Sequence, residues 1–402
     1  MKYVVILGDG MADYRQSFLG DKTPLMLANK PFIDGLAKVS EVGLCQTVPC
    51  SLKPGSDVAN LSVLGYNPLE CYSGRSPLEA ASIGISLKDT DITARANLVT
   101  VSNEPVYEDK KMIDYSAGEI STAEATELIN YLASHLNNDK YTLYAGISYR
   151  HCLVIDKGSL MGDLTPPHDI TKKPVKGHLP TSEGGKELLD IMKKSYELLK
   201  DHPVNKKRML EGKNPANSLW FWGDGTKPNL QSFYDKFGIK GGIISAVDLL
   251  KGIGKLAKMQ VIEVEGATGN YDTNFVGKAN ACVKGLKDGL DFVYLHMEAP
   301  DECGHHGDAK NKIYSIEQID NVVKIIYDGL KDMGEDFAFL ILPDHPTPLS
   351  IMTHCSDPVP YLLYSSKQNA NGVDAYDEEN ASETGINEKE GYKLIQKLFS
   401  IK

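Results

Sequence analysis

The stretch FVYLHMEAPDECGHHGD, residues 292–308, runs from a short apolar strand directly into a group of side chains that bind metal ions in proteins. Asp301 and His305 lie four residues apart, and Pro300 and Gly304 predict a bent loop here, because both residues disfavour a helix. A carboxylate and an imidazole can meet one divalent cation, which accepts mixed oxygen and nitrogen donors. The stretch therefore predicts half of a metal site at a strand end.

A second stretch supplies the other half. FAFLIL, residues 337–342, has the continuous apolar character of a buried strand, and Asp344 and His345 follow it, with His354 further along. Five of the ten histidines lie in residues 296–354. Taken singly, each side chain is more simply a loop histidine or a helix-capping aspartate. Two strand ends that each deliver an Asp and a His favour a metal site.

The N-terminal run YVVIL, residues 3–7, predicts a third buried strand, and Asp9 follows it between two glycines. Ligands collect at the carboxyl ends of strands in open α/β sheets, so we expect Asp9 to lie beside Asp301 and Asp344. A dinucleotide-binding turn is the competing interpretation. It is disfavoured because the third glycine of that motif is missing after Gly10.

Strand-like and helix-like segments alternate along the chain, which predicts an α/β fold with a doubly wound, mainly parallel sheet. A helical stripe of Ile and Val runs from Ile313 to Leu330 and indicates core packing. The composition of the sequence changes near residue 86, where a smaller α/β insertion is expected to begin. We predict a core domain of residues 1–85 and 181–402, and an inserted lid domain of residues 86–180 that binds substrate.

Composition limits the function classes. The 402 residues are 42% hydrophobic and carry a net charge of −11, which argues against nucleic acid or an anionic membrane as partner and favours an enzyme for a small molecule. The seven cysteines include no Cys-x-x-Cys pair, as expected of reduced thiols in a cytoplasmic protein. No apolar run reaches membrane-spanning length. Association of the chain with further copies of itself is left open.

The segment PGSD, residues 54–57, is expected to deliver Ser56 to the start of a helix. An ordinary N-cap is the simpler interpretation. A serine there can also meet a phosphate, and a neighbouring divalent ion can activate its hydroxyl as a nucleophile. The insertion carries Arg95 and Arg150, which as single arginines are weak candidates for contact with an anionic substrate.

Several motifs together carry a resemblance to a known family. They are ILGDGMAD (6–13), PGSD (54–57), GRSPLEAA (74–81), TPPHDI (165–170), EAPDECGH (298–305) and PDH (343–345). The chain resembles the alkaline phosphatase superfamily and, within it, the archaeal-type cofactor-independent phosphoglycerate mutases. That resemblance extends over essentially the whole chain and implies a core sheet of alkaline-phosphatase type.

The resemblance also implies chemistry. One metal ion is expected on Asp301, His305 and His354, and a second on Asp9, Ser56, Asp344 and His345. These two divalent ions are expected to be manganese, magnesium or zinc, with no requirement for 2,3-bisphosphoglycerate. Ser56 would carry the phosphoryl group while 3-phosphoglycerate and 2-phosphoglycerate interconvert. The expected contacts to substrate phosphate or carboxylate are Arg95, Arg150, His151 and His168.

Two other functions stay open from the sequence. Related proteins phosphorylate small hydroxylated metabolites, as a homoserine kinase does, and a phosphatase of the same superfamily would let water accept the phosphoryl group. A phosphometabolite-binding protein without catalysis is disfavoured, because all seven metal and nucleophile residues are present. A sulfatase is disfavoured because its nucleophile motif is missing.

Overall fold

The computed structural model describes residues 1–401 and divides the chain into two compact units. Unit 1 combines Met1–Tyr72 with the chain from Asn229 onward, and unit 2 is Ser73–Pro228. A core interrupted by an inserted domain was predicted, but the boundaries at residues 86 and 180 were wrong.

The insertion is longer because its sheet needs strands and helices from beyond both predicted ends. Strand β7 (Ser218–Thr226) pairs with β3 (Ile92–Val101) along most of its length, and helix α7 (Glu183–Leu199) packs on β7. Helix α5 (Ser76–Ser82) packs on β3, β6 and β7. These elements bury their apolar faces within unit 2, so the boundary lies outside them.

Unit 1 is built on a sheet that has eight strands within the described residues, in the order β13-β2-β12-β11-β1-β10-β8-β9. The strands are β1 (Lys2–Gly8), β2 (Glu41–Cys45), β8 (Gly241–Ile244), β9 (Gln260–Val261), β10 (Phe292–Met297), β11 (Phe337–Leu342), β12 (Val359–Ser365) and β13 (Asn387–Glu388). Strand β1 pairs in parallel with β10 and β11, whereas β12 is antiparallel to β11 and β2. Every residue of β1, β10 and β11 is buried, which explains their continuous apolar sequences. The predicted mainly parallel sheet is confirmed.

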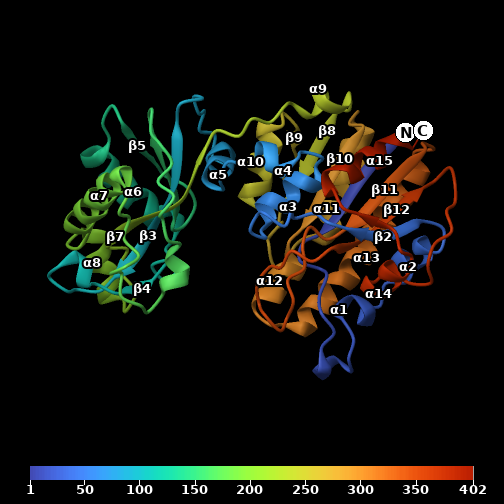
Figure 1. Cartoon of the computed structure of the whole chain (residues 1–402), viewed down its shortest axis with the longest axis horizontal. Helices are drawn as coiled ribbons and strands as arrows, with labels where there is room; N and C mark the ends of the chain where they lie inside the picture. The colour runs from blue at the N-terminus through green and yellow to red at the C-terminus, as the bar shows by residue number, and fades with distance from the viewer. Residues whose placement is uncertain (402) are drawn as a thin grey trace. The chain divides into compact units, whose positions relative to one another are not determined.

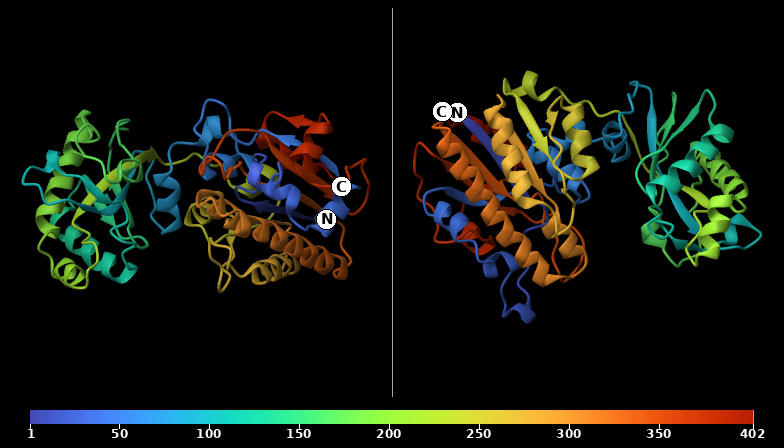
Figure 2. Two further views of the ribbon diagram at one scale, coloured as in Figure 1. Left: turned by 90° about the horizontal axis from the view of Figure 1, so that it is seen from below. Right: turned by 180° about the vertical axis from the view of Figure 1, so that it is seen from behind.

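Helices cover the sheet of unit 1 (Figure 1). They are α1 (Pro24–Leu27), α2 (Pro31–Ala37), α3 (Ser56–Val63), α4 (Pro68–Cys71), α9 (Phe233–Phe237), α10 (Asp248–Leu256), α11 (Phe275–Lys287), α12 (Ala299–His305), α13 (Ala309–Asp332), α14 (Glu378–Glu383) and α15 (Leu394–Ser400), with short 3-10 turns η1 (Ser17–Leu19) and η4 (Gly391–Lys393). The right-hand view of Figure 2 shows α11 and α13 lying side by side across one face. The predicted stripe is buried on α13 from Ile316 to Leu330.

Helix α12 corrects one prediction. Residues 299–305 were expected to form a loop, yet they form a helix that carries both Asp301 and His305. Pro300 is tolerated because it lies in the first turn, where its missing N–H has no helical partner to lose. Gly304 is needed for close packing, since a β-carbon there would come within 2.5 Å of the Thr347 carbonyl oxygen.

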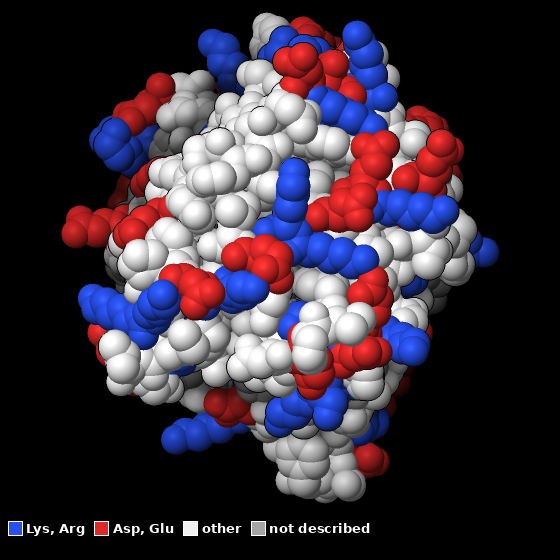
Figure 3. Space-filling model, turned by 90° about the vertical axis from the view of Figure 1, so that its left-hand side faces the viewer, with Lys and Arg blue, Asp and Glu red and all other residues white. Residues whose placement is uncertain are grey.

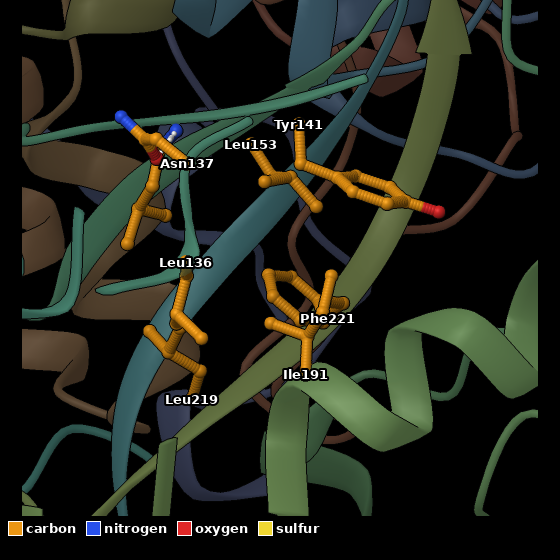
Figure 4. Close-up of a pocket in the computed structure, with 8 residues that line it drawn as sticks. Leu136, Asn137, Tyr141, Leu153, Ile191, Leu219 and Phe221 are labelled. Atoms are coloured by element: carbon orange, nitrogen blue, oxygen red, sulfur yellow. Dashed lines mark hydrogen bonds between the residues drawn. The ribbon is translucent and has the colours of Figure 1, made fainter. Parts of the chain in front are cut away.

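Unit 2 has its own sheet and core. Its described residues form five antiparallel strands, which are β3, β4 (Met112–Asp114), β5 (Tyr141–Tyr144), β6 (Arg150–Ile155) and β7. The further helices are α6 (Thr122–Leu136) and α8 (Pro203–Leu210), with 3-10 turns η2 (Tyr107–Asp109) and η3 (Pro167–Ile170). A narrow crevice in this core is lined by Leu136, Tyr141, Ile191 and Phe221 among others (Figure 4). None of its lining side chains is charged, so the crevice is a packing feature and not a site for an anion.

The surface in Figure 3 interleaves Lys and Arg with Asp and Glu. The described residues of unit 2 form exposed ion pairs, for example Lys140 with Glu187 at 2.6 Å and Lys193 with Glu108 at 2.5 Å. Across residues 1–401, no helix combines the length and the apolar character needed to cross a membrane.

Candidate metal and nucleophile site

The first group of candidate ligands consists of Asp9, Asp344 and His345, at the carboxyl ends of the adjacent parallel strands β1 and β11. All three side chains are buried, and one ligand atom from each lies within 4.8 Å of the others. His345 Nε2 is 3.6 Å from Asp9 Oδ1 and 3.4 Å from Asp344 Oδ2. The structure thus brings together the side chains that the sequence placed at these two strand ends.

The second group consists of Asp301, His305 and His354. Asp301 and His305 share one face of α12 because they are four residues apart, and His305 Nε2 lies 3.2 Å from Asp301 Oδ2. His354 Nε2 lies 3.5 Å from Asp301 Oδ1 and 2.9 Å from His305 Nε2. His305 Nδ1 lies 3.0 Å from the carbonyl oxygen of Met352, which leaves Nε2 directed at the group.

Ser56 lies at the first residue of α3, and its Oγ is 3.1 Å from His345 Nε2. Gly55 occupies the N-cap position and the Ser56 hydroxyl makes no capping bond, so the N-cap interpretation was wrong. The Asn60 amide donates to the Ser56 carbonyl at 2.8 Å and to Asp344 Oδ2 at 2.7 Å. Asn60 therefore fixes the start of α3 relative to the first group.

Besides Asn60, three further side chains that contact these groups were missed in the sequence. His296, at the end of β10, lies with its Nε2 2.9 Å from Asp9 Oδ2, and Ser245 Oγ lies 3.1 Å from His296 Nδ1. The Thr347 hydroxyl donates to Asp301 Oδ1. A buried histidine near the carboxyl end of an apolar strand was a signal for His296. Ser245 and Thr347 gave no such signal, because their partners are remote in sequence.

Burial and neighbouring charge act differently on the groups of this site. Burial, together with the carboxylates of Asp344 and Asp301, raises the pKa of Asp9 well above its usual value. Burial would also raise the pKa of Asp301, but hydrogen bonds from His305 and His354 hold it well below its usual value. The Asp301 hydrogen bond raises the pKa of His305 to about 9, whereas burial lowers the pKa of His345.

Both groups fit divalent cations. Each offers carboxylate oxygen and imidazole nitrogen, the donors that Zn²⁺ and Mn²⁺ accept. Asp9 Oδ1 is buried and has no hydrogen-bond donor among the described residues. A buried carboxylate oxygen without a donor is costly, and a cation between it and His345 Nε2 would satisfy it.

Unit 2 holds a separate cationic group. Arg95 Nε lies 2.9 Å from Glu79 Oε2, and the Arg95 guanidinium stacks 4.1 Å from the centre of the Trp222 ring. The ring of His168 lies 5.2 Å from that of Trp222, and Arg75 Nε donates to Glu79 Oε1 at 2.9 Å. Burial alone would raise the pKa of Glu79, but the charges of Arg95, Arg75 and Arg150 lower it. The net effect is a lowered pKa, so the Glu79 carboxylate stays ionised.

The structure separates His151 from its neighbour Arg150. Arg150 is one of the charges that act on Glu79. His151 follows it on β6, and successive side chains of a strand point to opposite faces. His151 Nδ1 accepts the N–H of Gly146 at 3.0 Å, and burial lowers the pKa of His151 to about 3. The structure therefore brings together Arg95, Arg150 and His168 with Glu79, but not His151.

The fold and this site define an α/β protein with candidate metal ligands and a serine at the carboxyl ends of its parallel strands. A family profile described as 2,3-bisphosphoglycerate-independent phosphoglycerate mutase matches residues 37–205. The chain is 47% identical over 99% of its length to a probable 2,3-bisphosphoglycerate-independent phosphoglycerate mutase of Geobacter sulfurreducens, all of which is covered. It is also 47% identical to the Methanosarcina barkeri protein of that name, with both chains fully covered. The chain belongs to the 2,3-bisphosphoglycerate-independent phosphoglycerate mutase family, as its motifs predicted.

Solved structures agree with this assignment. The PH0037 protein from Pyrococcus horikoshii superposes with a TM-score of 0.82 at 30% identity, covering 99% of this chain and 96% of that one. The cofactor-independent phosphoglycerate mutase from Thermoplasma acidophilum gives a TM-score of 0.63 at 25% identity, with full coverage of both chains.

Proposed function

We propose that this protein is a metal-dependent phosphoglycerate mutase that interconverts 3-phosphoglycerate and 2-phosphoglycerate through phospho-Ser56. The observation that carries the proposal is the position of Ser56 Oγ, 3.1 Å from His345 Nε2 and beside two Asp and His groups. The names of the relatives support this substrate, since eight of them are named as 2,3-bisphosphoglycerate-independent phosphoglycerate mutases, one of these as a probable one. A kinase for another hydroxylated metabolite is not favoured.

Two divalent ions, of manganese, magnesium or zinc type, would be held by Asp301, His305 and His354, and by Asp9, Ser56, Asp344 and His345. When bound, they would supply positive charge that favours the serine alkoxide and offsets charge on the phosphoryl oxygens. No 2,3-bisphosphoglycerate takes part. We place the reaction in the cytosol, because all seven cysteines are unpaired, as expected in a reducing compartment.

In the first transfer, Ser56 Oγ loses its proton and forms a bond to phosphorus while the bond from phosphorus to the substrate oxygen breaks. That oxygen takes up a proton and becomes a hydroxyl of glycerate. In the second transfer, the other hydroxyl loses its proton to bond phosphorus, and Ser56 regains its own. The start of α3 supports the phosphoserine, since N–H groups at a helix N-terminus attract phosphate.

The side chains proposed to contact the anionic substrate belong to unit 2. Arg95 and Arg150 offer cationic donors, and guanidinium groups pair with carboxylate or phosphate through two parallel hydrogen bonds. Glu79 and the Trp222 ring hold the Arg95 side chain in place before substrate arrives. His168 adds a third donor at the same ring.

The test is isotope tracing with ³²P-labelled 3-phosphoglycerate, followed by acid quenching and peptide mapping. Label is expected on Ser56 in the unmodified protein and on no residue in Ser56→Ala, which should retain less than about a thousandth of the activity. Ser62→Ala on the same helix is the control and should keep both label and activity. Label on another residue would refute the role of Ser56 as the nucleophile. Release of free phosphate would indicate a phosphatase, and a strict requirement for ATP would indicate a kinase.

A further inference from the structure

Thr347 contacts both candidate metal groups. Its hydroxyl donates to Asp301 Oδ1 of one group, and the same oxygen lies 3.3 Å from His345 Nδ1 of the other. The side chain is fully buried. Gly10 leaves room for this arrangement, because a β-carbon there would come within 2.6 Å of both Thr347 Oγ1 and Asp301 Oδ1.

A threonine hydroxyl has only one proton to donate. The Asp301 carboxylate can only accept, so the proton of Thr347 is used there, and toward His345 the hydroxyl oxygen can only accept. The proton of a neutral His345 ring must then lie on Nδ1. Its Nε2 is left with the lone pair that faces Ser56, Asp9 and Asp344.

We propose that Thr347 is a positioning residue that sets the ring tautomer of His345 and the orientation of Asp301 together, and thereby prepares both groups for metal binding. This inference rests on the proposed metal dependence. Partners of this kind orient metal-binding imidazoles and carboxylates in other metalloproteins, and their loss weakens metal binding by about 10- to 100-fold.

The backbone of Thr347 is anchored independently of its hydroxyl. Its carbonyl accepts a hydrogen bond from Lys312 Nζ at 2.8 Å, and its N–H donates to the carbonyl of Ala12 at 3.2 Å. Lys312 Nζ also donates to Asp13 Oδ2 at 2.7 Å, and both of these side chains are fully buried. Removal of the hydroxyl alone should therefore leave the loop in place, which makes Thr347→Val a specific perturbation.

The experiment is a Co²⁺ titration of metal-free protein, followed by visible absorption and calorimetry. The unmodified protein is expected to bind two ions. In Thr347→Val both binding steps should weaken by about tenfold or more, and in Thr347→Ser, which keeps the hydroxyl, both should stay within about threefold. Thr100→Val in unit 2 is the matched control, because Thr100 is buried and its hydroxyl donates to the Pro215 carbonyl at 2.7 Å.

The outcomes separate this inference from the proposed function. If the unmodified protein binds no Co²⁺, the metal-dependent function fails. If it binds two ions and Thr347→Val binds both equally well, the role of Thr347 is refuted and the function stands. Nitrogen-15 NMR of the histidine rings in unmodified, metal-free protein provides a check that does not depend on folding of a variant: a proton on Nε2 of His345, instead of Nδ1, would refute the inference.

Discussion

Replacement of Lys312 by Met removes the cation from a fully buried ion pair in unit 1. Lys312 Nζ donates to Asp13 Oδ2 at 2.7 Å and to the Thr347 carbonyl at 2.8 Å, and neither the Lys312 nor the Asp13 side chain reaches solvent. In Lys312→Met, Asp13 keeps only uncharged donors, namely the Gln16 amide at 2.9 Å and the N–H groups of Tyr14 and Leu349. The variant therefore leaves a buried carboxylate without its counter-ion.

Breaking such a pair from one side costs about 3 to 5 kcal/mol. A domain of this size loses about 2 to 4 °C of melting temperature per kcal/mol, so the transition of unit 1 should fall by about 6 to 20 °C. Calorimetry of the metal-free protein measures this transition. The double variant Lys312→Met, Asp13→Asn should recover part of the loss, because it removes the uncompensated charge as well.

Lys324→Met is the matched control, since it makes the same change on the same helix. Lys324 Nζ lies 2.6 Å from Asp328 Oδ2, but both side chains are about half exposed. Exposed pairs contribute about 0 to 1 kcal/mol, so this variant should melt within about 4 °C of the unmodified protein. A Lys312→Met protein that melts no lower than Lys324→Met would refute the assignment of the buried pair as a major stabilising contact.

Three further predictions concern the site and its surroundings. His296→Leu should weaken Mn²⁺ binding by about 10- to 100-fold in a calorimetric titration, because Asp9 Oδ2 loses its 2.9 Å partner; unchanged binding would contradict this. Arg150→Ala should lower kcat/KM for 3-phosphoglycerate by about 10- to 150-fold in a coupled assay, because one charge-assisted contact to the substrate is lost. Unchanged kinetics would exclude Arg150 from the substrate site. Burial raises the pKa of Glu378 to about 7, so its contribution to stability is present below about pH 4.5 and is lost as the pH rises through 7. Urea unfolding at several pH values should show that Glu378→Gln lacks this decline, and an identical slope in both proteins would contradict the assignment.

The central strands and their carboxyl ends could be predicted because one physical constraint dominates them. Strands β1, β10 and β11 are covered on both faces, so their sequences are almost continuously apolar, and the first polar residues mark where each strand ends. Since parallel strands end at the same edge of a sheet, Asp9 and Asp344 had to lie close together. The clustering of these candidate metal ligands follows from this register.

Other features depend on contacts that local sequence does not encode. Whether Pro300 ends a helix or opens one depends on its position in the first turn of α12, and the tight approach of Gly304 to Thr347 involves a residue that is remote in sequence. The separation of His151 from Arg150 depends on which residues of β6 face α5, and this requires the strand pairing. The missed ligand partners, such as His296 and Ser245, meet only across neighbouring strands.

The sequence also restricts the loop that carries Thr347. Pro346 and Pro348 flank it, and each ring fixes its own φ near −65°. Thr347 precedes a proline, which confines it to extended backbone conformations. These restrictions lower the number of conformations that the unfolded segment can adopt, so less conformational entropy is lost when the Thr347 hydroxyl is placed between Asp301 and His345. The two prolines restrict the backbone around Thr347, and the buried Lys312 anchors its carbonyl. Both restraints favour a fixed position of the Thr347 hydroxyl between the two groups of candidate ligands, which come from strands and helices far apart in the chain.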